Sequence, residues 1–461
     1  MTHPEWALKH KIKGSELRNI RGKYYLYKIT SKWDKKLKKT KKITLGQIGV
    51  ITEEHGLIPT GAKRRGPIPK GKSVFKKEPV EKKEEGFLDH FSQIKDYRVS
   101  KNQLYTVAEI LFVTLCAVIC GADGWQDIEA YGRSRIHHLR EYLNYNNGAP
   151  SDDTVRRFFR YIDLKNFEQL FRDWVKSIAK KANVKVIAID GKASRHSFDG
   201  DGAMLHTVSA FSTETRIVLG QERVDDKSNE ITAIPKMLEW LDVKDHIITI
   251  DAMGCQYNIA ANIIKKEGHY IFSLKGNQSS LFDDVKLYFQ DQEYQAECGK
   301  HIDYDKGHGR IETRECLVTN NTHWLRESHP HWSSIKSMIQ INSTRELKSS
   351  ITTESRYYIS SLEYPQDDEG AEKMLLNIRS HWAIENSLHW VLDMSFNDDQ
   401  SRIRKGNAPY AMAIIRHIAM NTLQLTKNQL DKPDGHTIKR LRKLCGWDEK
   451  MLDKALEKKS S

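Results

Sequence analysis

Two aspartates stand at the ends of apolar stretches, where their carboxylates could bind a cation. Asp190 closes the stretch in AIDGK, and Asp251 closes the one in TIDAMGCQ. A carboxylate at a strand end projects into the loops at the sheet edge, where open α/β folds place their ligands. A single strand-end aspartate is often only a turn residue. Two carboxylates held close together repel unless a cation neutralises them, so the pair favours a metal site.

A third carboxylate lies in a stretch that mixes imidazoles, acids and apolar side chains. On a helix, residues spaced by four share one face, and here they are His381, Glu385, His389 and Asp393. The residues nearer the apolar side are Ile384, Leu388, Val391 and Leu392. This stripe predicts a site-facing helix. The alternative is a polar surface with one or two core imidazoles that have hydrogen-bond partners.

The elements that must position these acids form an alternating pattern from about residue 184 onward. Strands are expected at 186–190, 206–212, 216–224, 247–251 and 270–274, and helices at 231–241 and 259–266. Residues 298–362 contain β-like runs such as RIETRECLV, so a β-rich insertion is expected there. Helices return at 371–392 and 410–425, and a polar tail with one amphipathic helix at 437–444 closes the chain. The sequence therefore predicts a mixed sheet flanked by helices.

The part of the chain before this sheet reads as helical, with apolar residues at helical spacing between residues 104 and 118. Ser151 is a suitable N-cap for a helix with two acids in its first turn. The basic residues of that helix are Arg156, Arg157 and Arg160. They either contact DNA or form a solvated basic face, and the sequence leaves both possibilities open.

Positive charge is concentrated in the first 86 residues. They carry 23 Lys+Arg and 9 Asp+Glu, a net charge of +14, whereas the whole chain carries +13. A concentrated basic segment is typical of a polyanion binder, although a solubilising tail has a similar composition. Strand patterns at 23–30 and 41–49 predict a β-hairpin. The lysines of its connection are expected to reach DNA phosphates, namely Lys35, Lys36, Lys38 and Lys39.

No segment of the sequence predicts secretion or membrane insertion. The first ten residues are polar, and the most apolar run, residues 106–120, is shorter than the roughly 20 residues that span a bilayer. The six cysteines form no C-x-x-C pair, so Cys116 and Cys120 are expected to be core thiols. A cytoplasmic, nucleoid-associated protein is therefore expected.

Several long motifs, in order, resemble one known family. They are IDGK with Asp190, DDKSNEITAIPKMLEWL (225–241), TIDAMGCQ with Asp251, LKGNQ (274–278), HWAIENSLHWVLDMSF (381–396) and DDQSRIR (398–404). From about Phe87 to about Leu452 the chain resembles the H-repeat-associated family of bacterial insertion-sequence transposases. These are DDE transposases with an RNase H-like core, so the resemblance implies that fold. The first 86 residues resemble the short β-rich DNA-binding modules of some transposases and phage integrases.

The resemblance also implies the chemistry. Asp190, Asp251 and Glu385 would be the three catalytic acids and would hold two Mg²⁺ ions, which Mn²⁺ can replace. Water would first be activated for strand cleavage, and the freed 3′-hydroxyl would then attack target DNA. Lys192 and Lys275 are expected near the scissile phosphate. His381 and His389 are expected to support the ligands rather than bind the metal, because imidazole favours softer ions.

The implied partner is double-stranded DNA, both the terminal inverted repeats of the element and the target. A homodimer is expected, because two transposon ends must be brought together. The expected segments are a basic β-rich DNA-binding module (1–60), a linker (61–86), a helical DNA-binding domain (87–182), the first part of the catalytic core (183–297), a β-rich insertion (298–365), the rest of the core (366–425) and a C-terminal tail (426–461).

Two departures and two alternatives accompany this interpretation. The wider superfamily often places Tyr, Arg and Lys around the third acid, where this chain has Ile378, His381 and Leu392. After Phe396 the expected Asn-Glu-Asp is Asn-Asp-Asp. One alternative is a catalytically silent relative that only binds DNA. The other is an oxidoreductase whose transition metal is held by the His-Glu-His-Asp stripe, which leaves the two aspartates and the basic segment unexplained.

Overall fold

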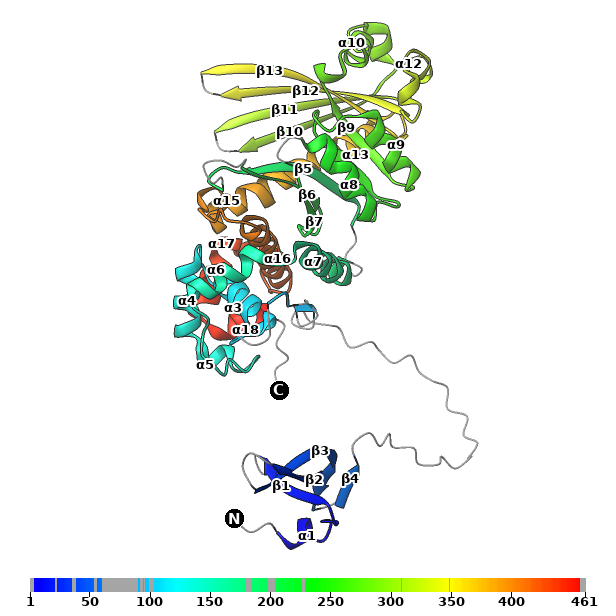
Figure 1. The fold of residues 1–461 in the computed structure, drawn as a ribbon. Coiled ribbons are helices and arrows are strands. Elements are labelled where there is room, and N and C mark those ends of the chain that lie inside the picture. The colour runs from blue at the N-terminus through cyan, green and yellow to red at the C-terminus, as the bar shows by residue number, and fades with distance from the viewer. Residues whose placement is uncertain are drawn as a thin grey trace, which may run out of the picture. The chain divides into compact units, whose positions relative to one another are not determined.

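The computed structural model describes residues 4–20, 23–34, 39–53, 56–59, 90–91, 94, 96–98, 103–179, 184–197, 204–225, 229–307, 309–347 and 349–456. The chain divides into two units, Met1–Lys82 and Lys83–Ser461 (Figure 1). Within the described residues, no helix combines the length and the apolarity needed to cross a membrane.

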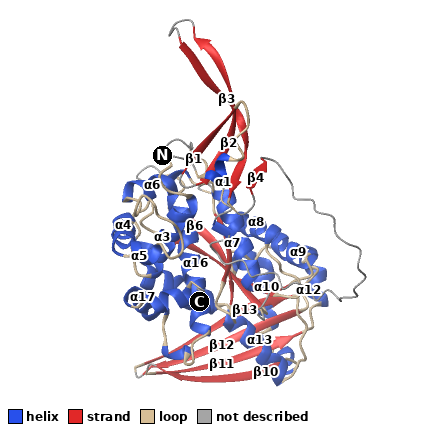
Figure 2. Ribbon diagram, turned by 90° about the horizontal axis from the view of Figure 1, so that it is seen from below, coloured by secondary structure: helices blue, strands red, loops and turns tan. Residues whose placement is uncertain are grey.

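The first unit is an antiparallel sheet in the order β1-β2-β3-β4 (Figure 2). Its elements are α1 (Glu5–Leu8), β1 (Ser15–Ile20), β2 (Lys23–Asp34), β3 (Lys39–Thr52) and β4 (Gly56–Pro59). β2 and β3 pair as the predicted hairpin and are much longer than β1 and β4. Lys35, Lys36, Lys38 and the side chain of Lys39 lie outside the described residues, so their phosphate contacts stay a prediction.

The second unit begins with the helices that the apolar periodicity predicted. They are α3 (Val107–Ile119), α4 (Trp125–Ser134), α5 (Ile136–Leu139), α6 (Asp152–Tyr161) and α7 (Leu164–Ala179). A capping box starts α3, in which Glu109 N donates to Thr106 Oγ1 and Thr106 N donates to the Glu109 carboxylate. The helix is buried on nearly all sides, so it is a core helix. Ser151 caps α6, as predicted.

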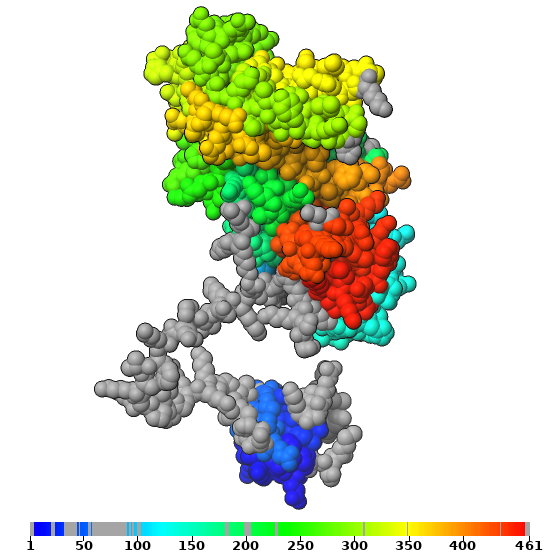
Figure 3. All heavy atoms as spheres, turned by 180° about the vertical axis from the view of Figure 1, so that it is seen from behind, coloured from blue at the N-terminus to red at the C-terminus, as the bar shows by residue number. Residues whose placement is uncertain are grey.

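The end of the chain differs from the predicted polar tail. After α16 (Ala408–Asn428) and the 3₁₀ turn η6 (Pro433–Gly435), two helices follow, α17 (Ile438–Trp447) and α18 (Glu449–Ala455). They pack on the 103–179 helices: Arg442 donates to Val118 O, and His138 Nε2 lies 2.7 Å from Asp453 Oδ1. Figure 3 shows these red helices against the cyan segment. The amphipathic helix was predicted at 437–444, but its packing was not, because the core residues it shares with α18, among them Ile438, Leu441 and Leu452, are spread among many charged ones.

A mixed sheet occupies the middle of the second unit, in the order β10-β11-β12-β13-β9-β8-β5-β6-β7. Its central strands are β5 (Val186–Ser194), β6 (Leu205–Ser212), β7 (Val218–Arg223), β8 (Ile247–Ile250) and β9 (His269–Leu274). β5, β6 and β7 form an antiparallel meander, and β8 and β9 run parallel to β5. Helices α8 (Glu230–Trp240) and α9 (Tyr257–Lys265) connect them. The predicted α/β class, with a mixed sheet flanked by helices, is confirmed.

The predicted β-rich insertion extends this same sheet. Its strands are β10 (Gly299–Gly307), β11 (Arg310–Thr319), β12 (Ser337–Leu347) and β13 (Ser350–Ser360), and β13 pairs with β9. The helical turns around them are η2 (Gly276–Gln278), α10 (Ser279–Tyr288), α11 (Gln292–Ala296), α12 (His323–Ser328) and η3 (Pro330–Trp332). The pairing of β13 with β9 brings distant residues of the insertion to the edge of the central strands.

The helix predicted at 371–392 is interrupted at the third acid. It consists of α13 (Asp368–Ser380), α14 (Trp382–Ile384), a π-helical turn η4 (Glu385–His389) and α15 (Trp390–Phe396), followed by η5 (Asp398–Gln400). Ile384, Leu388 and Leu392 are buried, as predicted. A regular α-helical stripe is wrong in detail, because the π turn changes the step between its polar residues. π turns of this kind are frequent at functional sites.

Candidate active site

Asp190 and Asp251 occupy equivalent places on neighbouring parallel strands. Val186 pairs with Ile247, and the register continues to Ile189 and Ile250, so each aspartate is the next residue on its strand. The residues before them are apolar, β-branched or small, and mostly buried, which anchors both strands in the core. Asp251 directly follows β8, as predicted, whereas the predicted strand end at Asp190 is wrong, because β5 continues through Asp190 to Ser194 and stays paired with β6. The parallel pairing of β5 with β8 still sets the two aspartates at equivalent positions.

Burial makes both carboxylates hard to ionise. Desolvation raises the pKa of Asp190 to about 6, and the negative charges of Asp251 and Glu230 add to the rise. The pKa of Asp251 is raised as well, chiefly by desolvation and also by Glu230. One backbone hydrogen bond to each acts in the opposite direction, from Gly191 N to Asp190 and from Gly254 N to Asp251. The strand ends thus concentrate negative charge that a cation would stabilise.

Glu385 joins this pair from the π turn. His389 Nδ1 lies 3.3 Å from Glu385 Oε2 and 3.6 Å from Asp190 Oδ2, so one buried imidazole bridges the first and third acids. The hydrogen bond from His389 lowers the pKa of Glu385. The Glu385 side chain remains 56% exposed, which leaves its carboxylate accessible from solvent. His389 thus fixes where the third acid stands relative to the strand.

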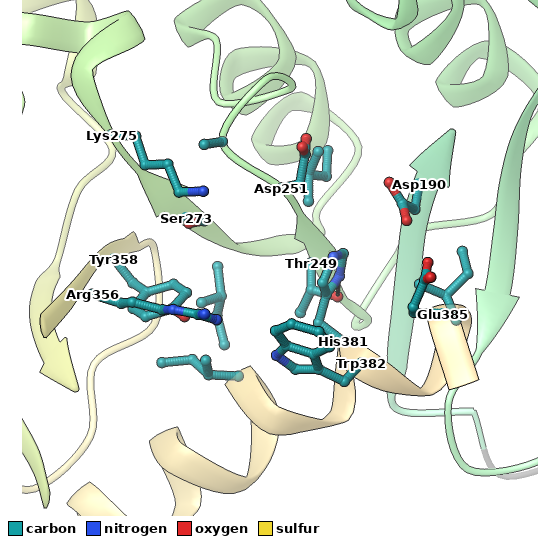
Figure 4. A pocket seen from close by; sticks show the side chains of 15 residues that line it. Asp190, Thr249, Asp251, Ser273, Lys275, Arg356, Tyr358, His381, Trp382 and Glu385 are labelled. Carbon is teal, nitrogen blue, oxygen red and sulfur yellow. Dashed lines mark hydrogen bonds between the residues drawn. The ribbon is translucent and has the colours of Figure 1, made fainter. Parts of the chain in front are cut away.

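All three acids line one cavity of about 350 Å³ (Figure 4). The polar and aromatic residues that line it with them include Thr249, Lys275, Arg356, His381 and Trp382. His381 Nδ1 lies 3.0 Å from Thr249 Oγ1, and burial lowers the pKa of His381 to about 4. A neutral imidazole therefore stands one helical step before Glu385 at neutral pH.

The donor set suits a hard divalent cation. Ligand atoms of Asp190, Glu385 and His389 lie within 4.8 Å of one another, and Asp251 lines the same cavity. Carboxylate oxygens are the ligands that Mg²⁺ takes, and Mg²⁺ keeps several waters that substrate phosphates can replace. The raised pKa values of the two aspartates point the same way, because a cation would remove the charge repulsion that causes part of the rise.

Lys192 lies in an ionic network rather than at the cavity. Its ammonium is 2.6 Å from Asp393 Oδ1 and 3.3 Å from Asp399 Oδ1, and its side chain is only 10% exposed. The same network binds Asp398, which accepts hydrogen bonds from Ser194 and from the buried Arg416. It joins β5 to the segment after Glu385, and the contact of Lys192 with a phosphate stays a prediction.

The other predicted basic residues are placed as follows. Lys275 comes directly after β9 and lines the cavity. Arg156, Arg157 and Arg160 are exposed on α6. Arg156 and Arg157 pair with Asp153, and Arg160 lies over the Tyr161 ring at 5.3 Å. They form a basic surface of the kind that either a DNA contact or a solvated face would show.

Two residues near the acids, Arg356 and Glu230, were missed by sequence reasoning. Arg356 on β13 pairs with Glu354, and its guanidinium lies 5.4 Å from the centre of the Trp382 ring. Only the pairing of β13 with β9 brings it to the cavity, and no local pattern reveals that pairing. Glu230 begins α8 beside the Asp190 strand end. Its signal was present in the motif SNEITAIP, which carried the resemblance without a role for its acid.

Comparison with known proteins decides the family. The sequence model described as "Transposase DDE domain" matches residues 183–422, and the one described as "DDE_Tnp_1-associated" matches residues 88–175. The chain belongs to the DDE transposase family. The matched ranges contain all three acids of the cavity, and residues 1–87 precede both of them.

Similar proteins carry matching names. "H repeat-associated putative transposase YhhI" of Escherichia coli strain K12 is 41% identical over 344 residues, which is 73% of this chain and 89% of that protein. "Putative transposase YncI" of Escherichia coli O157:H7 is 41% identical over 351 residues, 75% of this chain and 88% of that protein. The predicted membership of the H-repeat-associated transposases is confirmed.

Two further similarities set the limits of what membership implies. "Inactive transposase YbfQ" of strain K12 is 40% identical over 70 residues, covering 15% of this chain and 83% of that protein. A solved piggyBac transposase synaptic complex with hairpin DNA matches with a TM-score of 0.38 and 9% identity over 81% of this chain and 78% of that chain. The family supports a DNA-cleaving kind of enzyme that uses divalent metal and binds DNA.

Proposed function

We propose that this DDE transposase is catalytically active and moves a bacterial insertion sequence by metal-dependent strand cleavage and strand transfer. The observation that carries the proposal is the equivalent register of Asp190 and Asp251 on neighbouring parallel strands, with Glu385 lining the same cavity. Two buried carboxylates with raised pKa values are costly to keep unless they serve a cation. A protein that only bound DNA would gain nothing from that cost.

Asp190, Asp251 and Glu385 would hold two Mg²⁺ ions, which Mn²⁺ can replace. When bound, the ions activate the attacking oxygen and stabilise the leaving oxygen in phosphoryl transfer. His389 holds Asp190 and Glu385 at a fixed separation. His381 is neutral at neutral pH, so it adds no positive charge beside the metal ligands. Lys275 and Arg356 supply positive charge at the cavity wall, where they can orient a phosphate.

The proposed substrates are the two terminal inverted repeats of the element and a target duplex. The basic first unit and the exposed arginines of α6 would bind the DNA backbone. A homodimer on DNA would bring the two ends together. The runner-up function is a silent relative that binds DNA without cutting it.

A cleavage assay separates the two functions. The full chain is incubated with a duplex that carries the DNA flanking its gene, with Mg²⁺, with Mn²⁺ or with a chelator. We expect cleavage and joining only with metal. Asp190→Ala, Asp251→Ala and Glu385→Ala should each abolish cleavage and leave DNA binding within a few-fold, because the ligands act on the transition state and not on the DNA groove. Binding without metal-dependent cleavage by the wild type would instead establish the silent relative.

A further inference from the structure

Glu230 lies beside β5 at Gly191, the residue that follows Asp190. It is the first residue of α8 and follows Asn229, the N-cap of that helix. Its side chain is 14% exposed, so its carboxylate is largely withdrawn from bulk water. An acid in the first turn is favourable toward the helix dipole, but this explains neither where the side chain points nor what it contacts.

The glycine of the IDGK motif makes room for this carboxylate. A Cβ atom placed on Gly191 would lie 1.8 Å from Glu230 Oε1 and 2.9 Å from His206 Nε2. Any side chain at this position would therefore push the Glu230 carboxylate away. Because Gly191 is the residue after Asp190, Glu230 rests on the backbone that sets the direction of the first catalytic acid.

His206 holds one of the two oxygens of Glu230. His206 lies on β6 opposite Ala193 of β5, and its Nε2 is 2.9 Å from Glu230 Oε1. Among the residues that the structure describes, Oε2 has no hydrogen-bond partner. The negative charge of Glu230 acts on both Asp190 and Asp251. One oxygen is thus fixed by His206, and the Glu230 carboxylate is near enough for its charge to act on the first two acids.

We propose that Glu230 is a fourth carboxylate of the divalent-metal site, oriented by His206 and admitted by Gly191. The inference rests on the proposed function, since it concerns the same ions. The negative charge of three carboxylates falls one short of the positive charge of two divalent ions. A fourth carboxylate would make the two equal. Mg²⁺ binds carboxylate oxygens together with several waters, and Gly191, the residue that follows Asp190 within β5, leaves space for the Glu230 carboxylate beside the first acid.

The first test measures metal binding, not activity. Free Mn²⁺ is counted by EPR spectroscopy in titrations of the full chain without DNA. Glu230→Gln keeps the size and the possible hydrogen bond to His206 and removes the charge. We expect its Mn²⁺ affinity to fall about ten-fold or more, which is the effect of losing a ligand or its direct support. Glu239→Gln, the same change at the exposed far end of α8, should bind Mn²⁺ as the wild type does.

A second variant tests the role of the glycine. Gly191→Ala should weaken Mn²⁺ binding by displacing Glu230. In a protein that already carries Glu230→Gln, the same substitution should lower the Mn²⁺ affinity much less than it does in the wild type. Wild-type Mn²⁺ affinity in Glu230→Gln overturns the proposal, and a loss of thermal stability alone would show that Glu230 only stabilises α8. These outcomes are separate from the proposed function, which fails if the wild type does not cleave DNA or if Asp190→Ala does.

Discussion

At the scale of single residues, the site combines groups whose charges oppose one another. Asp190 and Asp251 are buried enough to resist ionisation, whereas Glu385 is exposed and stabilised by His389. A site of this kind is poised for a cation, since metal binding requires the deprotonated carboxylates and competes with their protons. In the absence of metal, ionisation of Asp190 destabilises the folded protein.

The raised pKa of Asp190 has a measurable cost. Its pKa rises from 3.8 to about 6 in the folded protein, so this group stabilises the fold fully below about pH 3.8 and loses that contribution as the pH rises through about 6. Asp190→Asn stays uncharged. In EDTA at pH 8 its free energy of unfolding should therefore exceed that of the wild type by roughly 1 to 3 kcal/mol, and the difference should close near pH 4.

Denaturant titrations at several pH values measure this difference, with the exposed Asp283→Asn as the matched control. Saturating Mg²⁺ should reverse the order at pH 8, because only the wild type gains binding energy from the ion. If Asp190→Asn were less stable than the wild type at every pH without metal, the hydrogen bond from Gly191 N to Asp190 would stabilise the fold more than burial of the charged carboxylate destabilises it.

Two lysines that the motifs placed near the phosphate should behave in opposite ways. Lys192 is nearly buried between Asp393 and Asp399, so Lys192→Met removes the cation beside Asp393 and leaves Asp399 with Arg195 alone; this should cost roughly 2 to 4 kcal/mol of stability. Lys275 lines the cavity with no such network, so Lys275→Met should keep its melting temperature and lose cleavage. Thermal melts and cleavage rates of both variants check this, and a stable Lys192→Met with weakened DNA binding would restore the phosphate contact.

At the scale of elements, the two acid-bearing strands were predictable and the interrupted helix was not. The apolar stretches before Asp190 and Asp251 are local patterns, and parallel pairing then aligns the two acids. That β5 continues past Asp190 depends on its pairing with β6. The π turn at Glu385, the pairing of β13 with β9, and the packing of α17 and α18 all depend on non-local contacts. The network around Lys192 was missed for the same reason, since its partners lie about two hundred positions further along the chain.

The π turn has one buried face and one face toward the cavity, and substitutions should distinguish them. Leu388 is fully buried, so Leu388→Asp would bury an unpaired charge and should cost roughly 3 kcal/mol or more. His381→Ala should instead slow cleavage and keep the fold, because it removes the group between Thr249 and the cavity. Trp390→Asp, at a position 59% exposed, is the control for the charge. If His381→Ala lowered the melting temperature more than Leu388→Asp, the helix would be rotated from this arrangement.

At the scale of the whole molecule, the charge is divided unequally along the chain. Residues 1–86 carry a net charge of +14 in a chain of net +13, so the remaining 375 residues are close to neutral. Neutralising DNA phosphates releases counterions and makes affinity depend on salt. The basic first unit and the exposed arginines of α6 are therefore expected to provide contacts with DNA phosphates.

We therefore expect the first unit to supply most of the non-specific DNA affinity. If it makes roughly six phosphate contacts, the logarithm of the affinity should fall against the logarithm of salt concentration with a slope of about −5, from about 0.9 per contact. A chain that begins near Phe87 should bind more weakly and with a much shallower slope, and it should still bind, because Arg156, Arg157 and Arg160 remain. Salt titrations of both proteins by fluorescence anisotropy measure this.

Since the first unit has its own core of Ala7, Leu17, Leu26 and Ile51, its removal should leave the melting of the rest unchanged. An unchanged affinity and an unchanged slope would show that the positive charge of the first unit serves something other than DNA.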